Sequence, residues 1–263
     1  MKLSLMAMLH DEAIYVREWI EFHRMMGIER FYLYNRRSTD NWRETLAPYS
    51  DILEVTEWDH PRLYDGYNDA FIDAHQHCID HLRGRREWLA MIDIDEFLFS
   101  PMYSTVTEAI STLPQEWGAI GAHWMVFGPG DEREWRDAPV IERFTWRPNS
   151  VNYFNRWYKC IVRLDDPDLN TLGSSHRYRT RFGTFNEEGL RLDGNESPPC
   201  SSVLRVNHYF TKSRPEWETR HPTLEDGMPF ERDEKRWNDV QRRDVDDRTI
   251  WRFLPELKER LKR

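Results

Sequence analysis

In the N-terminal part of the chain, short apolar runs alternate with longer stretches in which apolar residues recur at helical spacing. The apolar runs predict buried strands at 3–9, 30–34, 52–58 and 88–94. The longer stretches predict helices at about 12–26, 39–46 and 65–82. Strands that alternate with helices are typical of a parallel sheet covered by helices, which is an α/β fold. Right-handed crossovers would bring the carboxyl ends of these strands to one edge of the sheet, where open α/β sheets bind ligands.

The second half of the chain has fewer regular patterns. Apolar runs at 119–127 and 203–210 predict further strands, and apolar spacing around Pro255 predicts a helical segment at 249–261. The stretch up to about Asn155 is rich in Trp, Arg and Pro and lacks periodicity. It suits either an irregular acceptor-binding region or a long surface loop.

The apolar run that begins at Trp88 leads into three acids, Asp93, Asp95 and Glu96. Because side chains alternate along a strand, Asp93 and Asp95 would point to the same side, roughly 6–7 Å apart. Two carboxylates in this position repel each other unless a cation lies between them. A divalent cation such as Mg²⁺ or Mn²⁺ takes oxygen ligands from carboxylates and substrate phosphates. The pattern therefore predicts a metal-bridged diphosphate site, with a solvated turn as the alternative.

Composition narrows the class of protein. The chain has 263 residues, 39% of them hydrophobic and 14% aromatic, which is enough to bury the core of one α/β domain. Its net charge of −9 is unlike that of a general nucleic-acid binder, so no nucleic-acid partner is expected. Three cysteines without metal-like spacing suggest reduced thiols and a cytoplasmic location. No run approaches the ~20 apolar residues of a membrane span, so membrane contact is expected to be peripheral at most.

Several other segments accompany the acidic run in a fixed order. They are Leu5–Glu12, Glu18–His23, Gly27–Asn35, Ser38–Asp40, Trp157–Val162, His176 and Asn207–Ser213. Together with Trp88–Phe97, these segments resemble the family 2-like and family 92-like glycosyltransferases in order and spacing, over most of the chain. The resemblance implies a GT-A fold, which is a Rossmann-like, mixed and mostly parallel sheet flanked by helices. It also implies an Asp-x-Asp metal motif and a nucleotide-sugar donor.

The resemblance further implies how the chain is organised. A single GT-A domain at 1–263 would contain a nucleotide-binding half at 1–100, an acceptor-side half at 101–213 and a C-terminal helical tail at 214–263. The tail departs from the usual continuation of the family, because prolines follow Arg214 and His221 where a helix is generally found. Acceptor-side details are therefore not transferred to this chain.

The metal site is one part of the implied chemistry. Asp95, and Asp93 directly or through water, would hold Mn²⁺ or Mg²⁺ on the donor diphosphate. GT-A enzymes commonly complete the metal sphere with a late histidine, so the resemblance assigns His208 as a third ligand. His208 lies in an apolar run, and a hydrogen-bonded core histidine is the competing interpretation.

Polar residues that follow the first two strands are candidates for contact with the nucleoside. Asp11 and Glu12 come directly after the first strand, where acids either cap the next helix or contact the substrate. Asn35 and Asp40 border a loop that, by resemblance, would touch the base or ribose. Both residue types are also ordinary turn and N-cap formers. Both roles stay open for these four residues.

Lys159 and His176 lie within the family-like second half, where either can neutralise diphosphate charge as the sugar leaves. The alternative is a strand lysine that reaches solvent and an ordinary loop histidine. An inverting enzyme also needs a carboxylate that deprotonates the acceptor hydroxyl. Distance along the chain past the Asp-x-Asp motif favours Glu187 or Glu188 as this base, and Asp131 lies in the same portion of the chain.

Together these features predict a metal-dependent glycosyltransferase. It would move a sugar from a nucleoside diphosphate donor, expected to carry uridine, to a hydroxyl of a glycan or glycoconjugate acceptor, with inversion at the transferred sugar. A haloacid-dehalogenase-type phosphatase is the alternative enzyme, with Asp93 as nucleophile and Asp95 as acid/base, although that motif usually lies near the start of the fold. A non-catalytic nucleotide or sugar binder is the third hypothesis. The sequence identifies neither the sugar nor the acceptor.

Overall fold

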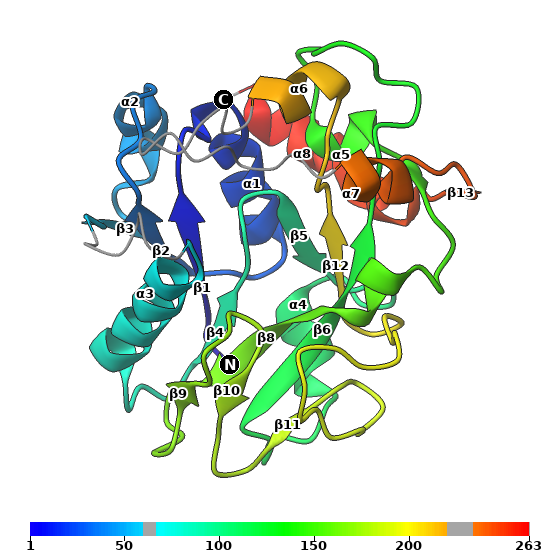
Figure 1. Cartoon of the computed structure of the whole chain (residues 1–263). Coiled ribbons are helices and arrows are strands. Elements are labelled where there is room, and N and C mark those ends of the chain that lie inside the picture. Colours follow the sequence, from blue (N-terminus) through cyan, green and yellow to red (C-terminus); the bar gives the residue numbers. More distant parts are fainter. Residues whose placement is uncertain (60–66, 220–233, 263) are drawn as a thin grey trace.

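The structure is a computed structural model that describes residues 1–59, 67–219 and 234–262. Within these residues a nine-stranded sheet forms the centre of the molecule, with helices on both of its faces (Figure 1). The strand order is β3-β2-β1-β4-β8-β6-β12-β5, and β11 pairs with β6. The sheet therefore joins the N-terminal and C-terminal parts of the chain in one layer.

The N-terminal part supplies four parallel strands and the helices between them. The strands are β1 (Leu3–Leu9), β2 (Arg30–Asn35), β3 (Leu53–Glu57) and β4 (Trp88–Met91). The helices are α1 (Ala13–Met25), α2 (Trp42–Leu46), the 3-10 turn η1 (Ala47–Tyr49) and α3 (Tyr67–Leu82). This alternation confirms the prediction from the hydrophobic pattern. Residues 65 and 66 of the third predicted helix lie outside the described residues.

β1 is buried along its whole length because a core layer covers each of its faces. Leu3 and Leu5 belong to the layer that contains Trp19 and Phe22 of α1. Met6 points to the other face, where it packs with side chains of α3. Burial on both faces explains why the sequence of β1 is a continuous apolar run. Each large side chain buried there contributes about 1.5–3 kcal/mol to the stability of the fold.

The C-terminal part adds the antiparallel pairs of the sheet. Its strands are β5 (Glu96–Phe99), β6 (Ala119–Val126), β8 (Tyr158–Arg163), β11 (Thr184–Phe185) and β12 (Arg205–His208). β8 is antiparallel to β4 and β6, and β5 is antiparallel to β12, whereas β6 is parallel to β11 and β12. Parallel pairs outnumber antiparallel ones in the described part of this sheet. The prediction of a mixed, mostly parallel sheet flanked by helices is confirmed.

Short elements fill the connections between these strands. They are α4 (Val106–Ser111), α5 (Val140–Arg143), β7 (Trp146–Arg147), η3 (Tyr153–Arg156), β9 (Asn170–Thr171) and β10 (Tyr178–Arg179). The region up to Asn155, predicted to be irregular, contains α5, β7 and most of η3. Its chain is therefore ordered by packing and not by long helices or strands.

The C-terminal segment returns to the first helix. Its elements are α6 (Arg214–Thr219), α7 (Glu234–Val240), β13 (Val245–Asp246), η4 (Thr249–Phe253) and α8 (Leu254–Leu261). Phe253 contacts Phe22 of α1 edge to face, with ring centroids 5.8 Å apart, and α8 lies along α1 (Figure 1). The predicted helical segment at 249–261 is confirmed as η4 followed by α8, with Pro255 in the first turn of α8. The proline after His221 lies outside the described residues, and the division of the chain into halves stays a prediction.

Across the ranges that the structure describes, no helix combines the length and apolarity that crossing a membrane requires.

One predicted strand is shorter than expected. β4 ends at Met91 and not at Ile94, and the chain turns through residues 92–95 before β5 begins at Glu96. The turn redirects the chain so that β5 pairs with β12 on the far side of the sheet. The expectation that Asp93 and Asp95 share one face of a strand is therefore wrong, because both lie in this turn.

Candidate functional site

A cleft with a volume of about 720 Å³ lies beside the carboxyl ends of β1 and β4. This is where an open α/β sheet binds ligands, and the volume is typical of a substrate site. Further lining comes from β6, β8 and β12. The charged and imidazole side chains in the lining are His10, Glu12, Arg36, Asp93, Asp95, Lys159, His176 and His208.

The turn after β4 is held by its own hydrogen bonds and by α1. The N–H of Glu96 donates to the carbonyl of Asp93 at 3.0 Å, and the Glu96 carboxylate accepts from the N–H of Asp93 at 2.9 Å. The indole N–H of Trp19 donates to the carbonyls of Asp93 (3.0 Å) and Glu96 (2.9 Å). These bonds pair backbone groups that would be costly to leave unpaired, and they fix the direction of the acids.

Lys159 of β8 lies among these acids. Its Nζ is 2.7 Å from Asp93 Oδ2 and 3.6 Å from Glu96 Oε2, and its side chain is 3% exposed. Burial alone would lower the pKa of Lys159, but the carboxylates of Asp93 and Glu96 raise it above its ordinary value. Desolvation alone would raise the pKa of Asp93, but the Lys159 ammonium outweighs it and holds that pKa below its usual range. Lys159 and Asp93 therefore form a charged pair in the cleft wall.

Asp95 and His208 meet in the cleft. The antiparallel register of β5 and β12 sets His208 opposite Glu96. Asp95 Oδ2 lies 3.5 Å from His208 Nε2, with the two side chains 3% and 8% exposed. The other ring nitrogen, His208 Nδ1, lies 3.8 Å from Glu96 Oε1. A carboxylate oxygen and an imidazole nitrogen thus converge on one buried point.

Asp95 and His208 fit a divalent cation. Oxygen and imidazole donors suit Mn²⁺, and a Mg²⁺-type ion keeps waters and substrate phosphates in its remaining positions. In the described part of the chain, no three His, Cys, Asp or Glu side chains form a metal-binding group. Asp93, the other predicted ligand, is paired with Lys159. Asp95 and His208 would therefore be the two protein ligands of the cation, and a diphosphate would complete its coordination.

The loops after β1 and β2 are tied to each other. Asp11 Oδ1 accepts from the N–H groups of Thr39 at 2.6 Å and Asp40 at 3.2 Å. Asp40 Oδ2 accepts from the N–H of Ala13 at 2.7 Å, so it caps α1 from the neighbouring loop. The capping role considered for Asp11 and Glu12 thus belongs to Asp40, because the Glu12 side chain makes no cap hydrogen bond.

Asn35 shapes the loop after β2. Its Oδ1 accepts from the N–H of Ser38 at 3.2 Å, and its Nδ2 donates to Glu57 Oε2 at 2.6 Å. These contacts match the turn-forming role that the sequence offered for Asn35. They join the ends of β2 and β3 beside the cleft.

Glu12 is the predicted nucleoside residue that reaches the cleft, whereas Asp11, Asn35 and Asp40 lie outside its described lining. His10 and Arg36 also line the cleft, and His10 Nδ1 donates to the carbonyl of Arg36 at 2.6 Å. This bond joins the loops after β1 and β2 on the cleft side. The sequence did not single out His10 or Arg36 for the cleft.

His176 lies in the cleft wall between two tryptophans. Its ring centroid is 5.3 Å from that of Trp124 and 4.9 Å from that of Trp157. Its Nδ1 donates to the carbonyl of Tyr158 at 2.8 Å. Burial, and after it the charge of Lys159, lowers the pKa of His176 to about 3. A neutral imidazole does not offset diphosphate charge, so of the two residues predicted for this task Lys159 is the one that carries charge.

Glu187 and Glu188 lie outside the described lining of the cleft. The Glu187 carboxylate accepts from the N–H groups of Ser202 (2.5 Å), Val203 (2.9 Å) and Leu204 (2.6 Å), so it holds the segment that leads into β12. Glu188 is exposed. The structure therefore does not bring these two acids to Asp95 and His208. Distance along the chain carries no information about which loop folds over the cleft.

Two residues that shape the site were not singled out from the sequence. Glu96 is fully buried, and Trp19 anchors the turn that carries the acids. Glu96 is one of the three acids after the apolar run, but only Asp93 and Asp95 were assigned to the cation, and Trp19 resembled an ordinary core residue of an amphipathic helix. The usable signal was the indole N–H, because a buried tryptophan needs an acceptor.

A family model for glycosyltransferase family 92 matches residues 6–168. The family 92 protein Os08g0121900 of Oryza sativa subsp. japonica is 25% identical over 178 residues, which cover 67% of this chain and 29% of the relative. The galactan beta-1,4-galactosyltransferase GALS2 of Arabidopsis thaliana is 28% identical over 105 residues, which cover 38% of this chain and 20% of the relative. The chain thus spans less than a third of the length of these two curated relatives.

Among solved structures, residues 1–349 of TarS from S. aureus match with a TM-score of 0.42 and 13% identity, over 80% of this chain and 60% of that chain. A TM-score this low carries no argument about activity. The family model, in contrast, spans more than half of the 263 residues. The chain therefore belongs to glycosyltransferase family 92.

Proposed function

We propose that the protein is a metal-dependent glycosyltransferase. It moves a sugar from a nucleoside diphosphate sugar, with uridine diphosphate as the nucleotide, to a hydroxyl of a glycan or glycoconjugate. The observation that carries the proposal is the approach of Asp95 Oδ2 to within 3.5 Å of His208 Nε2 in the cleft. Family membership supports sugar transfer, and the galactan galactosyltransferase among the relatives makes a galactosyl donor the first to test.

Asp95 and His208 are the residues that would hold Mn²⁺ or Mg²⁺. When bound, the cation supplies positive charge that stabilises the departing diphosphate. Asp93 and Glu96 orient the Lys159 ammonium in the lining of the same cleft. Because this charge is already in place before the reaction, it stabilises the leaving group without reorganisation.

Aromatic side chains supply an apolar wall of the cleft. Trp124, Phe154, Trp157 and Phe210 all line it. The rings of Trp124 and Trp157 are stacked with centroids 6.1 Å apart, and the ring of Trp124 lies 4.4 Å from that of His208. Such rings suit the apolar face of a sugar and keep water from the reacting centre.

Inversion at the transferred sugar requires a carboxylate that accepts the proton of the acceptor hydroxyl. The carboxylates in the described lining are Glu12, Asp93 and Asp95. Inversion is proposed from the family resemblance alone, and Glu187 and Glu188, which lie outside this lining, are not assigned as its base. A non-catalytic sugar binder would not transfer the sugar to an acceptor, so transfer distinguishes the two hypotheses. Family membership favours a glycosyltransferase over the phosphatase alternative.

The test is a calorimetric titration of uridine diphosphate into the protein with and without Mn²⁺. We expect binding that needs Mn²⁺ and that weakens about tenfold or more in Asp95→Ala and His208→Ala, because each variant removes a ligand of the cation. Asp131→Ala is the matched control, since this exposed acid pairs with Arg243 at 2.5 Å outside the cleft. Its titration should match that of the wild type.

Metal-independent binding, or equal binding by wild type and Asp95→Ala, would contradict the proposed metal site. Absence of binding under all conditions would contradict the proposed donor. A transfer assay with uridine diphosphate galactose then distinguishes an enzyme from a binder.

A further inference from the structure

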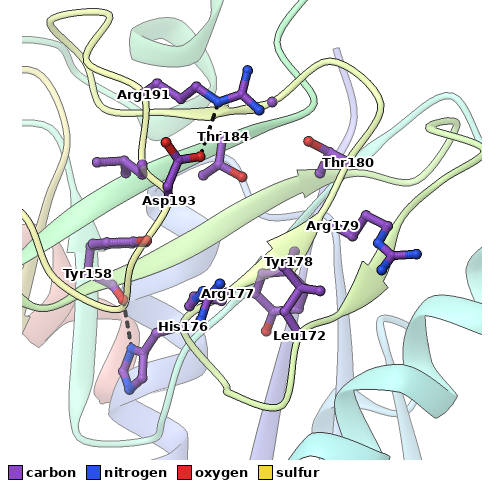
Figure 2. A pocket seen from close by; sticks show the side chains of 12 residues that line it. Tyr158, Leu172, His176, Arg177, Tyr178, Arg179, Thr180, Thr184, Arg191 and Asp193 are labelled. Atoms are coloured by element: carbon purple, nitrogen blue, oxygen red, sulfur yellow. Dashed lines mark hydrogen bonds and ion pairs between the residues drawn. The ribbon is translucent and has the colours of Figure 1, made fainter.

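A second, smaller pocket lies in the loops that follow β8 (Figure 2). Its volume is about 180 Å³, which is below the range of sites that enclose a whole ligand. Arg177 and Arg179 come from the segment around β10, and Arg191 comes from the segment after β11 (Figure 2). The side chains of Tyr158 and Tyr178 form part of the wall. We call this the arginine pocket.

The arginine pocket adjoins the cleft. His176 lines both cavities, and the neighbours Tyr158 and Lys159 on β8 line one each. Ser174 and Ser175, which precede His176, line the cleft as well. A molecule that reaches from the cleft past His176 therefore meets the arginines next.

Arg177 and Arg179 differ from the other arginines of this region. Arg163, Arg181 and Arg191 each pair with an acid two to thirteen positions away, at N–O distances between 2.9 and 3.2 Å. The side chains of Arg177 and Arg179 form no hydrogen bond or ion pair with any other residue that the structure describes. The chain has 46 acidic residues against 37 Lys and Arg, so acidic partners are in excess. Two guanidinium groups without an acidic partner therefore line one pocket. This arrangement indicates that an anion from outside the chain binds there.

We propose that the arginine pocket binds an oxyanion, a carboxylate or a phosphate, carried by the acceptor. A guanidinium donates two parallel hydrogen bonds to either group, which gives both affinity and orientation. The pocket volume suits one such group and part of a sugar ring, while the rest of the acceptor lies toward the cleft. Asp193 does not cancel this charge, because it pairs with Arg191 at 3.1 Å. The assignment of the oxyanion to an acceptor rests on the proposed function. Binding of an anion in the arginine pocket does not depend on that function.

The test uses the full chain, labelled with ¹⁵N, and follows the Nε–H signals of its arginines by NMR. The probes are glucuronate, inorganic phosphate and methyl glucoside, which differ in the group that they offer. We expect the signals of Arg177 and Arg179 to shift with at least one anion and not with neutral methyl glucoside. Stronger binding of glucuronate assigns a carboxylate, and stronger binding of phosphate assigns a phosphate.

Arg177→Gln and Arg179→Gln should each weaken binding of the preferred anion about tenfold or more, since each removes a charged hydrogen-bonding partner. Arg181→Gln is the matched control, because it removes the same charge from the same loop outside the pocket, where Arg181 pairs with Asp168. Melting curves establish that the variants are folded. Equal anion binding by wild type and both pocket variants, shifts with methyl glucoside as large as with the anions, or no shift with either anion would overturn the proposal.

The same samples are titrated with uridine diphosphate and Mg²⁺. Nucleotide binding should be unchanged in Arg177→Gln and Arg179→Gln, because neither residue lines the cleft. If the wild type binds the anion but not the nucleotide, the proposed function is contradicted and the arginine pocket is not. If it binds the nucleotide but neither anion, only the arginine pocket is contradicted.

Discussion

Glu96 is fully buried, and its carboxylate lies 3.6 Å from Lys159 Nζ and 3.8 Å from His208 Nδ1. Burial raises the pKa of Glu96, while the charge of Lys159 acts to lower it. The same carboxylate accepts from the N–H of Asp93. Glu96 therefore holds the backbone of Asp93 and lies close to Lys159 and His208 without lining the cleft, which is the position of a carboxylate behind a metal-bound histidine.

We predict that Glu96→Gln weakens Mn²⁺ binding about tenfold, because loss of a carboxylate behind a metal ligand typically has an effect of this size. Titration of the protein with Mn²⁺, followed by electron paramagnetic resonance of the free ion, measures the affinity directly. Glu108→Gln is the control, since this exposed glutamate lies on α4 outside the cleft. An unchanged Mn²⁺ affinity in Glu96→Gln would rule out the positioning role.

At the scale of elements, the segment that follows β6 passes close to the end of α7. A Cβ at Gly128 would lie 2.1 Å from the carbonyl oxygen of Val240 and 2.9 Å from Cα of Gln241. Both atoms belong to the backbone, so no side-chain rotation relieves the contact. The N–H of Gly128 also donates to the carbonyl of Trp146 at 3.1 Å, which fixes its position.

We predict that Gly128→Ala lowers the free energy of unfolding by about 1–3 kcal/mol, the usual cost of inserting an atom into a packed contact. Urea unfolding followed by tryptophan fluorescence measures the change. Gly194→Ala is the control, because the nearest atom to its Cβ is the oxygen of Glu196 at 3.5 Å, an ordinary contact. If both variants unfold at the wild-type urea concentration, then the segment after β6 and the end of α7 do not approach as closely as described.

At the scale of the whole molecule, four histidines are held neutral, three of them in the interior and His176 in the cleft wall. Burial lowers the pKa to about 3 for His23 and His176 and to about 4 for His75 and His123. Their folded pKa values lie below the unfolded value of about 6.5, so their contribution to stability is complete above that pH and is lost as the pH falls toward 4. Glu18 and Glu96 act in the opposite sense, because burial raises the pKa of each to about 7 and their contribution is lost as the pH rises from about 4.5 through 7.

We predict that the four histidines outweigh Glu18 and Glu96, so that the free energy of unfolding falls as the pH is lowered from 6.5 to 4.5. The measurement is urea unfolding at half-unit steps over that range. His75→Gln should flatten the slope, since it removes one group that must take up a proton on unfolding. A free energy that is constant or rises toward pH 4.5 would mean that the buried histidines do not control acid stability.

Much of the fold was predictable because its signals are local. The strands β1 and β2 and the helix α1 follow from apolar runs and helical spacing that a short window of sequence contains. The prediction of β4 was wrong beyond Met91, because the bonds that create the turn come from the Glu96 carboxylate and from Trp19. The spacing of apolar residues carries no information about such hydrogen bonds.

The candidate site was predictable in its residue types more than in its arrangement. Asp95, His208, Lys159 and His176 all line the cleft, as their place in the family-like segments suggested. Glu187 instead binds the backbone of the segment before β12. A carboxylate can act as a catalytic base or accept hydrogen bonds from backbone N–H groups. The residue type alone therefore does not distinguish these two roles.

The sequence by itself determined the βα alternation, the edge of the sheet at which a ligand would bind, and the family-like segments that carry the acids and the late histidine. Only the tertiary structure decided that Asp93 is paired with Lys159 while Asp95 faces His208. The reason is that β8 pairs with β4 and β12 pairs with β5, so that strands far apart in the chain lie side by side. Side-chain periodicity specifies how a strand is buried, but which strands pair depends on how the whole core packs.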